Sequence, residues 1–190
     1  MTTGVLVVLA GTSGAGKGTI GRRFLDRHPD VRWSVSWTTR PARPGEVEGV
    51  DYHFVTREEF ERLRDAGGFL EWFEVYGDLK GTPRQFVVDA LEAGHDVLLE
   101  LDVHGSLAVR EALPSALLVF VKAPSREEQR RRLEERGADD PEAVERRLAR
   151  AELEEALAAE QFDAVIVNDD VGRAVGELAA IVEARRSGSR

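Results

Sequence analysis

The sequence has no cysteine among its 190 residues, so disulfide bonds and thiolate metal ligands are excluded. Its four histidines do not show the spacing of zinc ligands. Long apolar runs are also lacking: Val5–Ala10 is far too short to cross a bilayer, and it ends at Gly11. No signal peptide is visible either. We therefore expect a cytoplasmic protein without a membrane partner.

Positive charge is scarce, because 26 Lys and Arg stand against 35 Asp and Glu and the formal net charge is −9. An acidic chain repels the phosphate backbone of DNA and RNA, so we expect no nucleic-acid partner. A small anionic substrate is still compatible, since it needs only a local cluster of cations. Hydrophobic residues reach 42% of the chain, which is enough for the core of a single α/β domain.

What the sequence does contain is an alternation of short apolar runs with helical patterns. The predicted core strands are Val5–Ala10, Val97–Leu101, Leu117–Val121 and Ala164–Val167, and the predicted helices are 19–27, 104–112, 125–136, 141–160 and 171–186. The first run is apolar throughout, which is typical of a central parallel strand buried on both faces. Strands that alternate with helices predict an α/β fold with a doubly wound parallel sheet.

Residues 33–93 interrupt this alternation, and we interpret them as an inserted, partly β subdomain. The strands predicted in it are 33–39, 51–56 and 69–76, and the helices are 56–66 and 83–92. The segment Thr56-Arg-Glu-Glu59 is a capping box that opens the first of these helices. The core of the single domain is then 1–32, 94–124 and 161–190, and the remaining segment, 125–160, is dense in arginine and glutamate.

A phosphate-binding loop is predicted between the first strand and the first helix. Gly11-Thr-Ser-Gly-Ala-Gly-Lys17 matches the pattern G-x-x-x-x-G-K in the required strand–loop–helix context. Glycines allow backbone N–H groups to surround a phosphate, and the helix N-terminus adds partial positive charge. Lys17 can follow the charge as a phosphoryl group moves. The residues predicted to bind the nucleotide phosphates are Gly11, Thr12, Ser13, Gly14, Ala15, Gly16, Lys17, Gly18 and Thr19.

The loop departs from the usual pattern at Gly18, where a serine or threonine normally supplies a hydroxyl to magnesium. Thr19 follows, in a Gly-Lys-Gly-Thr form that resembles the loop of adenylate kinases. Glu100 and Asp102 end a predicted strand near the loop, where such enzymes place a carboxylate for Mg²⁺ or its waters. Acids at strand ends are also common as plain surface caps. We predict Thr19 and Glu100 as the metal-binding residues.

A second cluster of polar residues lies in the inserted segment. Arg40 and Arg43 are three residues apart in a stretch broken by prolines. A guanidinium group can donate two hydrogen bonds to the oxygens of one phosphate. A rigid loop can direct both arginines at the same phosphate. Tyr52 can donate a further hydrogen bond. The alternative, two solvated surface arginines, is favoured if these residues are considered alone.

These residues are not alone, since Ser34–Phe54 resembles the GMP-binding segment of guanylate kinases, and the resemblance extends over about residues 5–183. The other motifs that carry it are Phe69-Leu-Glu-Trp72, Gly81-Thr-Pro83, Glu100-Leu-Asp-Val-His-Gly105, Ala123-Pro-Ser125, Arg132-Leu-Glu-Glu-Arg-Gly137 and Ile166-Val-Asn-Asp169. The resemblance implies a P-loop kinase that transfers the γ-phosphoryl group of ATP to GMP, and to dGMP, with Mg²⁺. It also implies that 33–93 binds GMP and that 125–160 is a lid.

The same resemblance assigns the acceptor site, with Arg40, Arg43 and Tyr52 on the GMP phosphate and Glu71 on guanine. Guanine presents N1–H and N2–H side by side, and one carboxylate can accept both, whereas adenine has no such donor pair. Lys80 stands where the family usually has a phosphate-binding tyrosine; a lysine keeps the capacity to bind phosphate but loses the aromatic ring. The other residues implied at this site are Ser36, Thr82, Glu100 and Asp102.

In the arginine-rich segment, the resemblance identifies Arg132, Arg136 and Arg147 as lid arginines over the donor phosphates. Most other charges there are interpreted as i,i+4 ion pairs on solvated helices. Asn168 resembles a residue near the adenine of ATP. The residues expected to spread the charge that develops during transfer are Lys17, Arg40, Arg136 and Arg147.

Two alternatives stay open from the sequence. Gly18 and Lys80 are compatible with a divergent kinase whose acceptor is dGMP, AMP or a modified nucleotide, although Glu71 favours guanine. Guanylate-kinase-like domains also serve as protein-binding modules without catalysis. Those modules usually lose the loop lysine and adjoin other domains, whereas this chain has Lys17 and we expect no appended domain. Monomer and homodimer are both compatible with the sequence.

Overall fold

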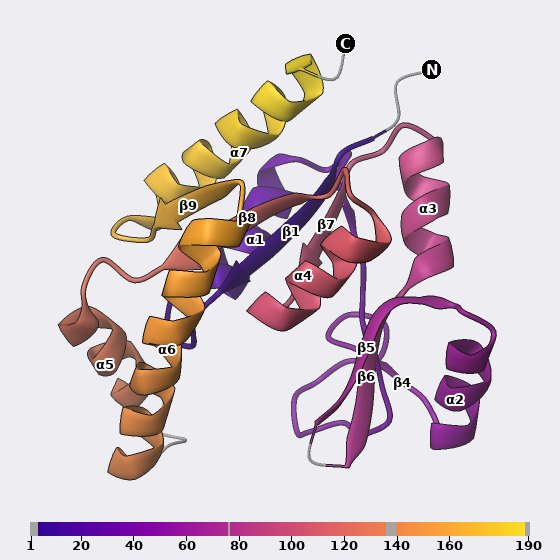
Figure 1. The fold of residues 1–190 in the computed structure, drawn as a ribbon, viewed down its shortest axis with the longest axis horizontal. Helices are drawn as coiled ribbons and strands as arrows, with labels where there is room; N and C mark the ends of the chain where they lie inside the picture. The colour runs from indigo at the N-terminus through magenta and orange to yellow at the C-terminus, as the bar shows by residue number, and fades with distance from the viewer. Residues whose placement is uncertain (1–3, 76, 136–139, 189–190) are drawn as a thin grey trace.

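The larger of two β-sheets forms the centre of the fold in the computed structural model, which describes residues 4–75, 77–135 and 140–188 (Figure 1). Its strands, in spatial order, are β2 (Arg32–Trp33), β7 (Val97–Glu100), β1 (Leu6–Gly11), β8 (Leu117–Lys122) and β9 (Ala164–Val167). All four neighbouring pairs are parallel. The predicted α/β fold with a doubly wound parallel sheet is therefore confirmed.

Helices cover both faces of this sheet, and β1 is buried between them. The described helices of the whole chain, including those that do not touch this sheet, are α1 (Lys17–Arg27), α2 (Arg57–Asp65), α3 (Arg84–Glu92), α4 (Val103–Ala112), α5 (Arg126–Glu135), α6 (Pro141–Gln161) and α7 (Val171–Gly188). Val7 and Leu9 pack into the core formed with α1 and α7, whereas Leu6 and Val8 pack into the core formed with α3 and α4. Each described helix is too short or too polar to span a membrane.

The smaller sheet lies beyond α3 and α4, below the larger sheet in Figure 1. Its strands, in order, are β4 (His53–Phe54), β3 (Trp37–Thr38), β6 (Asp78–Pro83) and β5 (Phe69–Val75). A core of its own holds it to α2, where the rings of Phe60 and Phe69 stack with centroids 4.3 Å apart. The predicted capping box is present, because Thr56 accepts from the backbone of Glu59 and Glu59 accepts from the backbone of Thr56.

The prediction of one strand over 33–39 was wrong. Trp33 pairs with Leu98 of β7 in the larger sheet, whereas Trp37 pairs with Gly81 of β6 in the smaller sheet. The backbone N–H of Ser34 still bonds to Leu98, so the chain changes sheets only after that residue. Alternating β-forming residues predict extended backbone but not which sheet the backbone joins.

Strand β6 was not predicted at all. Its residues include Lys80 and Gly81, and glycine weakens the pattern of a strand. Yet glycine is required at that point, because a Cβ atom there would lie 2.9 Å from the carbonyl oxygen of Glu71 on β5. Elsewhere the predicted elements match within a few residues, with α7 ending at Gly188 rather than residue 186. Tyr76, predicted to end a strand, lies outside the described residues.

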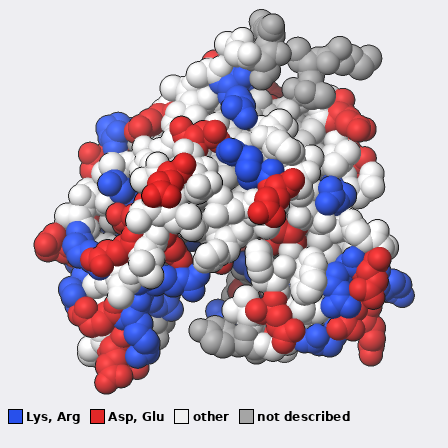
Figure 2. Space-filling model, in the orientation of Figure 1, with Lys and Arg blue, Asp and Glu red and all other residues white. Residues whose placement is uncertain are grey.

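Parallel pairing brings the functional segments to one edge of the larger sheet. The loop after β1 lies at the carboxyl end of that strand, and Glu100 and Asp102 lie at the carboxyl end of the neighbouring strand β7. Helices α5 and α6 flank this edge on one side, and the smaller sheet flanks it on the other (Figure 1). Figure 2 shows the surface hollowed between these two flanks, with Lys and Arg side chains gathered on the α6 side.

Candidate active site

The loop from Gly11 to Gly16 needs glycine at two positions, because a side chain would not fit at either of them. A Cβ atom on Gly11 would lie 2.3 Å from the carbonyl oxygen of Val121, on the neighbouring strand β8. Gly16 caps α1 with φ of +85°, and a Cβ atom there would lie 2.5 Å from Nδ2 of Asn168. The loop can therefore lie flat against the end of the sheet and expose its backbone N–H groups.

Two buried amide side chains hold this loop from behind. Gln129 on α5 donates from Nε2 to Oγ1 of Thr12 at 3.0 Å and to the carbonyl oxygen of Ser13 at 2.9 Å. Asn168, which follows β9, donates from Nδ2 to the carbonyl oxygen of Ala15 at 2.7 Å. Gln129 and Asn168 are only 2% and 3% exposed. The structure therefore places Asn168 under the loop, and Gln129 was missed by the sequence analysis.

The predicted lid arginines take different positions. Arg132 lies under the loop, where its Nη2 donates to the carbonyl oxygen of Asn168 at 3.1 Å and its Nε to Glu128 at 2.8 Å. Arg147 reaches the loop from α6, and its Nη1 donates to Oγ of Ser13 at 2.9 Å. Arg136 lies outside the described residues. Of the two described lid arginines, only Arg147 faces the open side of the loop.

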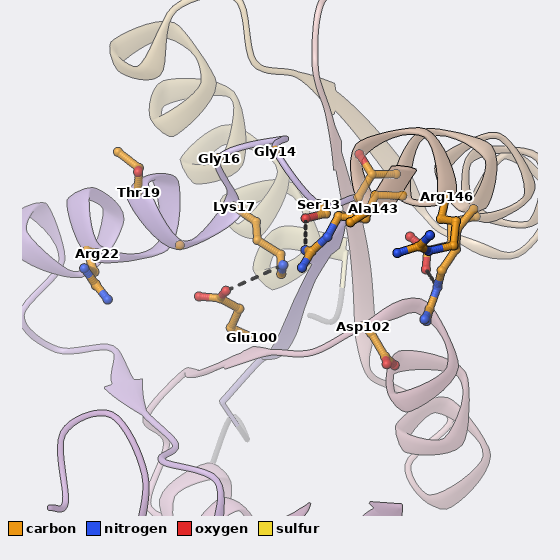
Figure 3. A pocket seen from close by; sticks show the side chains of 16 residues that line it. Ser13, Gly14, Gly16, Lys17, Thr19, Arg22, Glu100, Asp102, Ala143 and Arg146 are labelled. Atoms are coloured by element: carbon orange, nitrogen blue, oxygen red, sulfur yellow. Dashed lines mark hydrogen bonds and ion pairs between the residues drawn. The ribbon is translucent and has the colours of Figure 1, made fainter. Parts of the chain in front are cut away.

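A cavity of about 730 Å³ lies between the loop and α6; we call it the loop cavity (Figure 3). Arg146 and Arg150 line it beside Arg147, although the sequence analysis did not select them. Helical spacing was the available signal, because residues three, four and seven apart share one face of α6. The α6 residues in the lining are Ala143, Arg146, Arg147, Arg150 and Glu154.

Glu100 and Lys17 lie together at the inner wall of the loop cavity. The distance from Nζ of Lys17 to Oε1 of Glu100 is 3.8 Å, and the two side chains point toward each other in Figure 3. A Cβ atom on Gly18 would lie 3.3 Å from Oε2 of Glu100. The departure from serine or threonine at residue 18 therefore leaves room for this carboxylate beside the loop.

The two predicted metal-binding residues, Thr19 and Glu100, both line the loop cavity, but their side chains point in different directions (Figure 3). Thr19 is exposed, and its side chain points away from Lys17 and Glu100 in Figure 3. Within the described ranges, no three histidine or acidic side chains are grouped so as to hold a metal ion. Glu100 is thus the one predicted metal-binding residue whose side chain faces the Lys17 ammonium.

A second cavity of about 850 Å³ adjoins the first, between the end of β7 and the smaller sheet; we call it the sheet cavity. The two cavities share Lys17, Arg22, Glu100 and Asp102, so a ligand in each would meet at these side chains. The other predicted acceptor residues that line the sheet cavity are Ser36, Tyr52, Glu71 and Lys80.

A buried carboxylate forms one end of the sheet cavity. Glu71 on β5 is 7% exposed, and its Oε1 accepts a hydrogen bond of 2.5 Å from Oγ1 of Thr82 on β6. Burial raises the pKa of Glu71 from 4.5 to about 7. The Thr82 hydroxyl and the charge of Lys80 act in the opposite direction, and Asp102 adds to the rise of the pKa. This carboxylate therefore changes its charge near neutral pH.

Arg40 and Arg43 do not lie among the described residues that line either cavity. Arg40 instead holds Glu46 with both terminal nitrogens, at 2.7 and 2.5 Å. Glu46 also accepts from the backbone N–H of Arg43 at 2.8 Å. The hydrogen bond from Arg40 lowers the pKa of Glu46 to about 2. The sequence analysis missed this partner, although an acid six residues after Arg40 was visible.

The remaining phosphate candidates surround Tyr52. The guanidinium carbon of Arg40 lies 5.0 Å from the centre of the Tyr52 ring. Nζ of Lys80 donates to the Tyr52 hydroxyl oxygen at 2.9 Å. Arg40, Tyr52 and Lys80 therefore form one contiguous group at the edge of the sheet cavity, and Arg40 is turned toward Glu46.

Known proteins are similar to this chain both in sequence and in fold. A sequence profile of the family described as guanylate kinase matches residues 3–185. This chain belongs to the guanylate kinase family. The guanylate kinase of Symbiobacterium thermophilum is 53% identical over 186 residues, which cover 97% of this chain and 87% of that protein. The guanylate kinase of Rubrobacter xylanophilus is 50% identical over 182 residues, covering 96% and 95% respectively.

A solved structure agrees with this assignment. The crystal structure of the guanylate kinase from Anaplasma phagocytophilum superposes with a TM-score of 0.78 at 34% identity, and covers 98% of this chain and 88% of its own. The predicted P-loop fold and the predicted family are therefore both confirmed for this guanylate kinase family member.

The support of the loop by Gln129 generates a first prediction. Gln129→Ala should lower the free energy of unfolding by about 1–3 kcal/mol, because the buried hydroxyl of Thr12 and the partly buried carbonyl of Ser13 lose their donor. Urea denaturation followed by circular dichroism measures this difference. Gln85→Ala, at an exposed glutamine on α3, is the matched control and should change stability by less than about 0.5 kcal/mol. Equal stability of the two variants would contradict the supporting role.

The raised pKa of Glu71 generates a second prediction, on the pH dependence of stability. Because the folded protein holds this proton up to about pH 7 and the unfolded chain releases it near 4.5, stability falls as pH rises between these values. Glu71→Gln should therefore stabilise the fold by about 1–3 kcal/mol at pH 8.5 and have little effect at pH 4.5. Urea denaturation at both pH values tests this. Glu74→Gln, exposed on the same strand, should show no such pH-dependent gain.

Proposed function

We propose that this chain is a guanylate kinase that transfers the γ-phosphoryl group of ATP to GMP, and to dGMP, giving ADP and GDP. The observation that supports this function best is the meeting of two cavities. One contains the phosphate loop, the other contains a buried carboxylate, and they share Lys17, Glu100 and Asp102. A donor and an acceptor bound there would face each other across Lys17.

ATP occupies the loop cavity in this proposal. Backbone N–H groups of the loop and the N-terminus of α1 surround its phosphates. Lys17 and Arg147 both line the loop cavity and stabilise the charge that moves to the leaving group, together with Arg136. Arg132 and Asn168 support the loop beneath the nucleotide. Phosphoryl transfer depends mainly on such positioning and charge stabilisation, and needs no covalent intermediate.

GMP occupies the sheet cavity, with guanine at Glu71. An ionised Glu71 accepts from N1–H and N2–H of guanine, and Thr82 holds the carboxylate in place. Adenine would leave this buried acceptor unpaired, which rejects the wrong base strongly. Ser36 and Asp102 line the same cavity and are assigned to the base as well. Selection of guanine therefore follows from a carboxylate that water reaches poorly.

The GMP phosphate is assigned to Arg40, Arg43, Tyr52 and Lys80. Since Arg40 already holds Glu46, the phosphate must take over hydrogen bonds that the Glu46 carboxylate accepts in the structure. Phosphate presents more acceptor oxygens than a carboxylate and carries more charge, which favours this exchange. The phosphate oxygen of GMP then attacks the γ-phosphorus of ATP in line.

Magnesium fits this site through Glu100 rather than Thr19. The carboxylate of Glu100 lies beside Lys17, and Gly18 leaves space next to it. When bound, Mg²⁺ would supply positive charge that offsets the charge of the ATP phosphates. Glu100 would hold the ion or its waters.

The proposal includes a division of labour along the chain. Residues 33–93 form the GMP-binding subdomain, residues 125–160 form a lid, and the remaining segments form the core. Closure of α6 over the loop cavity would exclude water and suppress hydrolysis of ATP. A cytoplasmic location, where ATP and GMP are both available, is part of this proposal. No observation on the described residues favours a non-catalytic role.

The choice of acceptor is tested by a coupled assay of ADP formation. With ATP and Mg²⁺, we expect fast turnover with GMP and dGMP and turnover at least about 10²-fold slower with AMP, CMP and UMP, because only guanine pairs with Glu71. The control is the same assay without acceptor, which measures ATP hydrolysis. A preference for any base other than guanine would contradict the assignment of Glu71.

The role of the α6 arginines is tested by Arg147→Ala. We expect kcat to fall by about 10²–10³-fold, because a cation facing the transferred phosphoryl group is lost. Arg131→Ala is the matched control, since Arg131 is exposed on α5, pairs with Glu128 and Glu135, and is outside the linings of both described cavities. Steady-state kinetics of both variants decide the matter, and unchanged kcat in Arg147→Ala would remove that residue from the mechanism.

A further inference from the structure

Lys80 lies between Tyr52, which is assigned to the phosphate of GMP, and Glu71, which is assigned to guanine. It lies on β6 two residues before Thr82, so both side chains leave the same face of the strand. Across the ladder, Thr82 pairs with Glu71 of β5, and Lys80 pairs with Phe73 of the same strand. Strand β6 therefore carries Thr82, the partner of the Glu71 carboxylate, and two residues before it the cation Lys80.

On one side, Lys80 determines what the Tyr52 hydroxyl can do. Nζ of Lys80 lies 2.9 Å from the Tyr52 oxygen and 4.8 Å from the centre of its ring. An ammonium group has donors only, so the Tyr52 oxygen must accept this hydrogen bond. The hydroxyl proton of Tyr52 is then left to point at another acceptor. Because Tyr52 lines the sheet cavity, an anion bound there is such an acceptor.

On the other side, Lys80 acts on Glu71 through its charge. The positive charge of Lys80 lowers the pKa of Glu71, against the stronger effect of burial. Asp102 acts in the opposite sense to Lys80. The other charged or titratable groups that line this cavity are Lys17, Arg22, Asp51, Tyr52, Glu100 and Asp102. Lys80 differs from the other two described cations of this cavity, Lys17 and Arg22, because it lies on β6, the strand that pairs directly with Glu71.

We propose that Lys80 is a positioning residue that couples the two halves of the acceptor site, the phosphate contact made by Tyr52 and the purine contact made by Glu71. This inference rests on the proposed function, because it takes GMP as the occupant of the sheet cavity. Its consequence is specific: Lys80 affects the binding of a purine nucleoside that carries no phosphate. A residue that served the phosphate alone would not do so.

The experiment compares GMP with guanosine as probes, using isothermal titration calorimetry on the full chain. Lys80→Met should weaken GMP about tenfold or more at pH 7, because a charge-assisted hydrogen bond is lost. It should also weaken guanosine about fivefold, because a smaller share of Glu71 is ionised at pH 7 once a charge that lowers its pKa is lost. Lys80→Arg should restore most of both affinities, since it keeps the charge and the donors.

Two further measurements separate coupling from simple disruption. The pH midpoint of GMP binding should move to higher pH in Lys80→Met and stay in place in Arg62→Met, which removes an exposed charge on α2 outside both described cavities. Combining Lys80→Met with Tyr52→Phe should weaken GMP less than the product of the two single effects, because the pair acts as a unit. Thermal unfolding of each variant confirms that it is folded.

The outcomes are distinguishable. The proposal would be overturned if a folded Lys80→Met protein had both the guanosine affinity and the pH midpoint of the wild-type protein, even if it bound GMP more weakly. Fully multiplicative effects of Lys80→Met and Tyr52→Phe would overturn it as well. Failure of the wild-type protein to bind or phosphorylate GMP is a different result, because it would overturn the proposed function itself.

Discussion

Parallel pairing of β1 with β7 on one side and β8 on the other is the constraint on which both cavities depend. It places the ends of all three strands at one edge, so that the loop after β1 meets Glu100 at the end of β7. The pairing is held because β1 is buried on both faces, with successive side chains packed into opposite cores. Any change that loosened β1 would disturb the two cavities together, since Lys17 and Glu100 belong to both.

Cations in this site are held by partners before any ligand arrives. Arg40 holds Glu46, Lys80 holds Tyr52, and Lys17 lies beside Glu100. This explains how a chain with a net charge of −9 can present an anion site, because each cation is fixed in place by a local acceptor. In the proposed function, the GMP phosphate would replace Glu46 as the partner of Arg40, and a side chain that is already ordered would lose little conformational entropy on binding.

Much of the fold could be predicted because its signals are local in sequence. The apolar runs of the larger sheet and the loop from Gly11 to Lys17 are continuous segments, and both were found. Strands β2 and β3 are two residues long, which is too short for a periodic pattern, so their separation into two sheets was missed. The partners of the site residues depend on packing between distant segments. Gln129 therefore could not be assigned to the loop more than 100 residues before it.

The shared wall of the two cavities also has a consequence for inhibitor design. A single molecule with two purines joined by a chain of phosphates would reach from the loop cavity to Glu71 past Lys17. Such a ligand loses its translational and rotational freedom once rather than twice, so its affinity can far exceed that of either nucleotide. The number of phosphates that gives the highest affinity would then report the distance between the two proposed purine sites.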